Sequence, residues 1–250
     1  MMRFPLRLAA DLALKSASRA FRMSGSESSI TFIDPAELLH PGSAHPIDRE
    51  KILSLVSSKA SILWIRGSEP LEHPGVAHLV RAISNSRRFI FLETSAVRLR
   101  LRIHEFQPLP NFFFFIRIDF QPLEPDANPL SPGAHTLALE GIRAAQLSGF
   151  FVAAHTVIHP NSNPANLKSL AVLIQRRALD GWIITASQCD EALQRLAEVA
   201  RALIPSAGWR QFSARLEPEL LARSISRESP SAAVDSAPVA EVCEESVKVL

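Results

Sequence analysis

The sequence has very few cysteines, and this scarcity limits the metal chemistry open to it. Of its 250 residues, only Cys189 and Cys243 are cysteines. Two thiolates cannot complete a four-cysteine zinc site or hold a conventional iron–sulfur cluster. A disulfide scaffold is equally unexpected in a chain long enough to bury a large core. We therefore expect a reducing, cytoplasmic setting and no 4Fe-4S cluster.

Glycine is also scarce, and the motifs that depend on it are missing. None of the nine glycines belongs to a phosphate-binding P-loop, a dinucleotide-binding turn or a Gly-x-Ser-x-Gly elbow. Long apolar runs are absent too, since no stretch approaches the ~20 residues that a membrane-spanning helix needs. The net charge of +2 is too small to indicate nucleic-acid binding, and we expect no nucleic-acid partner.

Charge is distributed unevenly between the two ends of the sequence. Residues 1–24 carry five basic side chains against one acidic one, whereas residues 228–250 carry five acidic side chains against one basic one. Residues 3–22 have the polar spacing of an amphipathic helix. Three roles stay open for this helix: packing against the fold, lying on a membrane surface, or serving as a cleaved targeting peptide.

Between these ends, short apolar runs alternate with helical patterns. Strands are expected near residues 30–33, 61–65, 89–92, 111–118, 150–158 and 182–185. Helices are expected near residues 48–56, 74–83, 97–106, 134–147, 164–177 and 190–203. Continuous apolar strands that alternate with helices indicate a parallel sheet buried on both faces. The predicted fold class is therefore α/β, a partial TIM-like (β/α)6 barrel, where a closed barrel has eight units.

This pattern predicts four segments along the chain. They are an N-terminal amphipathic helix and linker (residues 1–27), the partial barrel (28–204), a C-terminal helical extension (205–228) and an acidic tail (229–250). The tail is rich in Ser, Ala, Pro, Val and Glu, which is the composition of a disordered segment.

Several motifs at the predicted strand ends are similar to those of one superfamily. Residues 65–71 read Ile-Arg-Gly-Ser-Glu-Pro-Leu, residues 91–95 read Phe-Leu-Glu-Thr-Ser, and residues 116–119 read Ile-Arg-Ile-Asp. In this order they resemble the Gly-Gly-Glu-Pro-Leu, Glu-Thr-Asn-Gly and Ser-Leu-Asp segments of the radical S-adenosylmethionine (radical SAM) superfamily. Residues 141–157 match the helix, glycine and strand that follow there. The similarity covers roughly residues 30–186 and implies the superfamily's six-unit partial barrel.

The resemblance also implies a cofactor-binding edge. In the family, the Gly-Gly-Glu-Pro segment receives the amino group of SAM through backbone oxygen and the carboxylate. Here Ser68 stands at the second glycine. The residues at which the resemblance places cofactor contacts are Gly67, Ser68, Glu69, Pro70, Glu93 and Asp119. SAM is thus the one cofactor that the resemblance leaves open.

The loop after the first strand departs from the family pattern. Family members read approximately Glu-Pro-Thr-x-x-Cys-Asn-Leu-x-Cys-x-x-Cys there, and aligning Asp34 and Pro35 places Leu39, Ser43 and Pro46 at the three cysteine positions. Leucine and proline offer no ligand atom, and a serine hydroxyl is a hard substitute for a thiolate. The leading hypothesis is therefore a pseudoenzyme, a radical-SAM-like barrel that serves as a binding or regulatory module.

A second hypothesis is a barrel enzyme that uses a divalent metal. Parallel-barrel active sites form at strand C-termini, where Glu69, Glu93, Asp119 and His155 are expected. The competing explanation is that these acids cap backbone amides or pair with neighbouring arginines, namely Arg66 and Arg117. No tight ligand spacing supports a metal, so we assign no metal ligands.

A third hypothesis is an accessory protein docked on a partner protein or a membrane surface. It rests on the basic N-terminal helix and the acidic tail. Deletion of residues 1–24 and a salt-sensitive liposome pull-down would distinguish it from the other two.

Overall fold

The computed structural model describes residues 2, 4–21, 29–38, 49–118 and 133–228. Their centre is one sheet of six parallel strands, ordered β1 to β6 along the chain. The strands are β1 (Ile30–Ile33), β2 (Ile62–Ile65), β3 (Phe89–Thr94), β4 (Phe112–Arg117), β5 (Phe151–Ile158) and β6 (Gly181–Ala186). The sheet forms a half-barrel, which confirms the predicted α/β partial barrel.

Helices follow the strands as the alternating pattern predicted. The larger ones are α3 (Arg49–Ser57), α4 (Val76–Ser84), α6 (Ala134–Leu147), α7 (Asn166–Arg176) and α8 (Glu191–Arg201), and α2 (Pro35–Leu38) is a single turn. The prediction of one continuous helix over residues 97–106 is wrong. That segment consists of the short helix α5 (Leu99–Arg102) and the 3-10 turn η2 (Ile103–Glu105), and a second 3-10 turn, η1, spans Pro70–Glu72.

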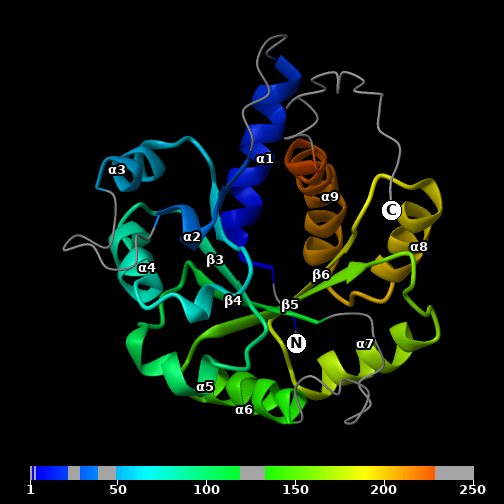
Figure 1. Ribbon diagram of the computed structural model, residues 1–250. Coiled ribbons are helices and arrows are strands. Elements are labelled where there is room, and N and C mark those ends of the chain that lie inside the picture. The colour runs from blue at the N-terminus through cyan, green and yellow to red at the C-terminus, as the bar shows by residue number, and fades with distance from the viewer. Residues whose placement is uncertain (1, 3, 22–28, 39–48, 119–132, 229–250) are drawn as a thin grey trace, which may run out of the picture.

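Two further helices lie on the other face of the sheet from this series, side by side in Figure 1. They are α1 (Leu6–Phe21) and α9 (Ala207–Glu228). Arg215 of α9 donates to the backbone oxygen of Leu12 at 2.9 Å and so ties the two helices together. The helix predicted from the weak pattern beyond residue 205 is thus real, and it packs into the open side of the half-barrel.

The four consecutive phenylalanines of β4 show why the strand is apolar throughout. Phe113 and Phe115 meet the ring of Trp209 from α9, with centroids 6.2 and 6.0 Å away. Phe112 and Phe114 point to the opposite face and pack on Phe150. All four are buried, as expected for a parallel strand covered on both faces.

Helix α1 packs its apolar face on the protein, as one of the three alternatives for this segment requires. Leu8 and Leu12 are buried, whereas Leu6 and Leu14 are exposed. Arg7 also donates to the backbone oxygen of Arg87. Of the helices that the structure describes, none is both long and apolar enough to cross a membrane.

Candidate functional site

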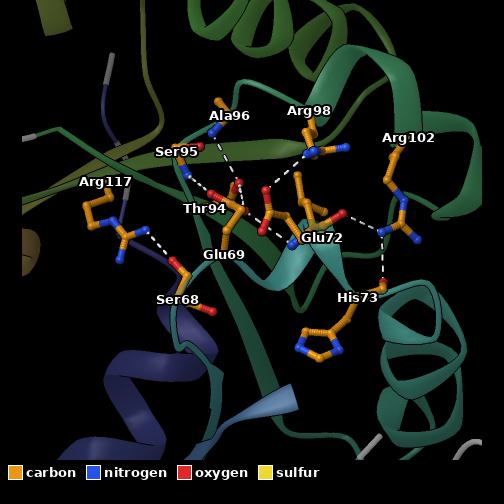
Figure 2. A network of polar contacts seen from close by, with 11 residues as sticks. Ser68, Glu69, Glu72, His73, Thr94, Ser95, Ala96, Arg98, Arg102 and Arg117 are labelled. Atoms are coloured by element: carbon orange, nitrogen blue, oxygen red, sulfur yellow. Dashed lines mark hydrogen bonds and ion pairs between the residues drawn. The ribbon is translucent and has the colours of Figure 1, made fainter. Parts of the chain in front are cut away.

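The edge that follows β2 is held in place by the carboxylate of Glu69. Its Oε1 accepts hydrogen bonds from the Thr94 hydroxyl at 2.6 Å and from the Leu71 N–H at 3.2 Å, and its Oε2 accepts from the Ser95 N–H at 2.8 Å. Figure 2 shows this carboxylate between η1 and the end of β3. Both oxygens are therefore engaged by the chain's own donors, and Glu69 joins the ends of β2 and β3.

Arg117 occupies the backbone oxygens of the same edge. From the end of β4 its guanidinium reaches past β3, and Nη2 donates to the Ser68 oxygen at 2.8 Å (Figure 2). Its Nη1 lies 3.4 Å from the Gly67 oxygen. Both acceptors are carbonyl oxygens, which carry no full charge, and Arg117 also interacts electrostatically with the carboxylate of Glu93.

Gly67 packs closely against the side chain of Asp34. A Cβ atom built at position 67 would lie 2.7 Å from Asp34 Oδ1, closer than such atoms approach. Asp34 follows β1, and its Oδ1 also accepts the Ala36 N–H at 3.0 Å, in the first turn of α2. A larger residue at position 67 would displace this carboxylate.

The outer side of the edge is fixed by Arg102. Its Nη1 donates to the His73 oxygen at 2.8 Å and its Nη2 to the Pro74 oxygen at 3.2 Å. The same side chain forms an ion pair with Glu105. Arg102 is the last residue of α5, so α5 anchors the segment that follows η1, while Glu69 ties η1 itself to β3.

Inside the barrel mouth, Glu93 is the buried acid at the end of β3. The Trp64 indole N–H donates to its Oε2 at 2.9 Å, and Arg66 Nε lies 3.6 Å from the same oxygen. Burial alone would raise the pKa of Glu93, but its interactions with His155, Arg66 and Arg117 outweigh burial and lower the pKa from 4.5 to about 2. Glu93 is therefore a carboxylate at neutral pH.

His155 links Glu93 to a buried hydroxyl. Its Nδ1 lies 3.4 Å from Glu93 Oε1, and its Nε2 lies 3.0 Å from the Thr185 Oγ1 at the end of β6. The three side chains are almost completely buried, with relative exposures of 2%, 0% and 1%. The contact between Glu93 Oε1 and His155 Nδ1 lacks hydrogen-bond geometry, so among the described residues both atoms are without a hydrogen-bond partner.

These groups line a cavity of about 640 Å³ at the carboxyl ends of the strands. That volume suits a small molecule. The polar side chains around it come from all six strands and their following loops, and they include Asp34, Arg66, Glu93, Ser95, Arg117, His155, His159, Thr185 and Ser187. Leu220 and Leu221 of α9 complete the wall.

Of the residues in the second hypothesis, the structure brings Glu93 and His155 together and separates Glu69 from them. Glu69 bonds to the β3 terminus outside the mouth, whereas Glu93 points inward to Trp64 and His155. Asp119 lies outside the described residues, as do Leu39, Ser43 and Pro46. Within the described ranges, no group of three or more His, Cys, Asp or Glu side chains could hold a metal ion. Of the acids named in the competing explanation, Glu69 accepts backbone amides and Glu93 pairs with Arg66.

Thr185 is one of the site residues that the sequence did not reveal, together with Trp64 and Ser187. A threonine within an apolar strand such as β6 looks like an ordinary strand residue. The feature that could have identified Thr185 as a site residue is its position at the end of that strand, level with the other strand termini. Its contact with His155 depends on how the strands curve, which the sequence pattern does not report.

Comparison with solved structures gives a similar fold at low sequence identity. The chain superposes on Streptococcus suis SuiB bound to S-adenosylmethionine with a TM-score of 0.50 and 14% identity, covering 81% of this chain and 50% of SuiB. Archaeal TYW1 gives 0.46 and 13%, with 70% of each chain covered, and TYW1 with a lysine-pyruvate adduct gives 0.45 and 12%, with 63% and 52% covered.

The chain thus spans about half the length of SuiB and of the adduct-bound TYW1. No family model and no curated protein matches it. The partial barrel is therefore similar in fold to radical SAM enzymes, and the comparison extends no further than the fold.

Proposed function

We propose that this protein is a radical-SAM-like half-barrel that acts as a binding or regulatory module and not as a radical SAM enzyme. The observation that carries the proposal is the contact of Arg117 with the backbone oxygens of Gly67 and Ser68. The resemblance implies that this edge would receive the amino group of SAM. In this chain a guanidinium already lies there.

Electrostatics make the two occupants incompatible. The SAM amino group is a cation, and a second cation held at the same oxygens would repel it. The remaining acceptor of the edge, the Glu69 carboxylate, already binds the Thr94 hydroxyl and two backbone N–H groups. To bind SAM, the chain would have to break its own hydrogen bonds without regaining acceptors elsewhere on this edge.

The cysteines of this chain also do not fit an iron–sulfur cluster. The two cysteines, Cys189 and Cys243, are far in sequence from the loop that follows β1. Cys189 lies beyond β6, next to the Asp190 cap of α8, and is exposed. Three thiolates on one loop are needed to leave one iron open for SAM, and this chain lacks them.

The divalent-metal alternative receives no support from the carboxylates, because Glu69 and Glu93 engage different partners. Binding to a partner protein or to a membrane surface stays compatible with a non-catalytic barrel. Burial of Leu8 and Leu12, however, leaves a reduced apolar face on α1 for a bilayer.

Anaerobic reconstitution with iron and sulfide tests the proposal. We expect no stoichiometric cluster absorbance and no cleavage of SAM under reducing conditions. A parent chain that assembles one cluster and cleaves SAM would overturn the proposal.

A further inference from the structure

We infer that the barrel mouth is a binding pocket for a small molecule that carries an oxyanion group, a carboxylate or a phosphate, held by Arg66 and Arg117. This inference rests on the proposed function, because it names the ligand class of the binding module. It concerns the inner cavity of about 640 Å³ and not the edge at Gly67 and Ser68.

Arg66 supplies the first unused donors. Its guanidinium lies over the rings of Phe32 and Trp64, 5.7 and 6.0 Å from their centroids, and its Nε faces Glu93 at 3.6 Å. Among the described residues it makes no hydrogen bond, and its side chain is 35% exposed. The two rings hold the guanidinium at the wall of the cavity, and its two terminal nitrogens are donors that can meet an oxyanion.

Arg117 supplies the second positive charge. Because its bonds go to the neutral carbonyls of Gly67 and Ser68, its charge is available to an anion in the cavity. The two carboxylates of the cavity are already engaged. Glu93 faces Trp64, His155 and Arg66, and Asp34 accepts the Ala36 N–H.

The floor of the cavity supplies hydrogen-bonding capacity that the fold leaves unused. Glu93 Oε1 and His155 Nδ1 face each other at 3.4 Å but have no hydrogen-bond partner among the described residues, and of the two only the imidazole nitrogen can donate to an oxyanion. The Ser187 hydroxyl, at the end of β6, is in the same condition and lines the same cavity. A fold that served only to fill its barrel would bury apolar side chains here, as it does at the level of Phe113 and Phe115.

The test uses the full chain with inorganic phosphate and with acetate as separate probes. Binding is followed by the side-chain nitrogen resonances of the histidines, with His155 inside the cavity and His104 outside it as the internal reference. We expect saturable shifts of the His155 signals with at least one probe and none at His104. A response to phosphate alone identifies a phosphate group, and a response to acetate alone identifies a carboxylate.

The variant Arg66→Gln removes the unused donors and keeps a polar side chain. Loss of a charge-assisted hydrogen bond of this kind should weaken binding of the probe by about tenfold to one-hundredfold. The matched control is Arg195→Gln, on the exposed surface of α8, where the side chain pairs with Glu191. It should bind the probe as the parent does, and circular dichroism confirms that both variants are folded.

Equal loss of binding in both variants, or no saturable binding of either probe to the parent, would overturn the inference. Neither outcome bears on SAM or on the cluster. Conversely, a parent chain that bound SAM would overturn the proposed function whatever its response to phosphate, so the two failures are distinguishable.

Discussion

The hydroxyl of Ser213 bonds to both backbone groups of Ile184 at the open edge of β6. It accepts the Ile184 N–H at 2.8 Å and donates to the Ile184 oxygen at 2.6 Å. One turn further along α9, Glu217 accepts the Ala186 N–H at 2.8 Å and pairs with Arg201. Two side chains thus satisfy an edge that a seventh strand would otherwise cover.

Replacing Ser213 with alanine should destabilise the protein. The change leaves the buried Ile184 N–H without its partner, which costs about 1–3 kcal/mol, while the Ile184 oxygen keeps its bond from Arg201 Nε at 3.2 Å. Urea unfolding of the Ser213→Ala variant measures the loss. Ser57→Ala is the control, because the Ser57 hydroxyl is exposed and bonds only to its own helix. Equal stabilities of the two variants would show that the edge contact is unimportant.

The contribution of Glu93 to the free energy of unfolding should decrease as the pH falls. The pKa of Glu93 is lowered to about 2 in the folded protein from 4.5, so its contribution is complete above about pH 5 and is lost as the pH falls toward 2. The difference in unfolding free energy between the parent and Glu93→Gln should therefore shrink on acidification from pH 6 to pH 3 (about three pH units).

The exposed Glu198→Gln variant of α8 is the control for that measurement, and it should show no comparable change. A difference between the parent and Glu93→Gln that stays constant over the acid range would contradict the charged, buried Glu93 described above.

Gly181 and Trp209 should be energetically coupled. A Cβ atom at position 181 would lie 2.4 Å from two atoms of the Trp209 ring. We expect Gly181→Ala to destabilise the protein by about 1–3 kcal/mol through overpacking, and to do so less when Trp209 is leucine. A double-mutant cycle by thermal unfolding measures the coupling. Purely additive effects would contradict this packing.

Much of the fold follows from the sequence because each strand is a continuous apolar run. A parallel strand covered on both faces needs such a run, and the four phenylalanines of β4 are the clearest case. Helix α9 was harder to predict. Its buried face includes Ser213 and Glu217, polar residues that are there to satisfy the edge of β6, so its apolar periodicity is weak.

The candidate site was predictable only in part, because the sequence pattern locates strand ends but does not report where their side chains reach. The strand-end positions of Glu69, Glu93 and His155 follow from the alternating pattern. That the Arg117 side chain reaches past β3 to Ser68 depends on its rotamer and on the curvature of the sheet. Neither quantity leaves a periodic signal in the sequence.

The alignment of the loop after β1 can be tested by restoring the thiols. Changing Leu39, Ser43 and Pro46 together to cysteine should allow some cluster to form on reconstitution, measured as iron and sulfide per chain. Assembly should be incomplete, because His40 and Pro41 interrupt the family pattern. The control places three cysteines at Ser231, Ser236 and Ser246 in the acidic tail. If the two variants took up iron alike, the register of the loop would be wrong.

The most direct test of the central claim is equilibrium dialysis of SAM against the parent chain and against Arg117→Ala. We predict no saturable binding to the parent, because the Arg117 guanidinium lies at the oxygens of Gly67 and Ser68. We predict a gain of binding in the variant, in which those oxygens are released. Saturable binding of one SAM to each parent chain, unchanged or weakened in Arg117→Ala, would contradict the proposed function.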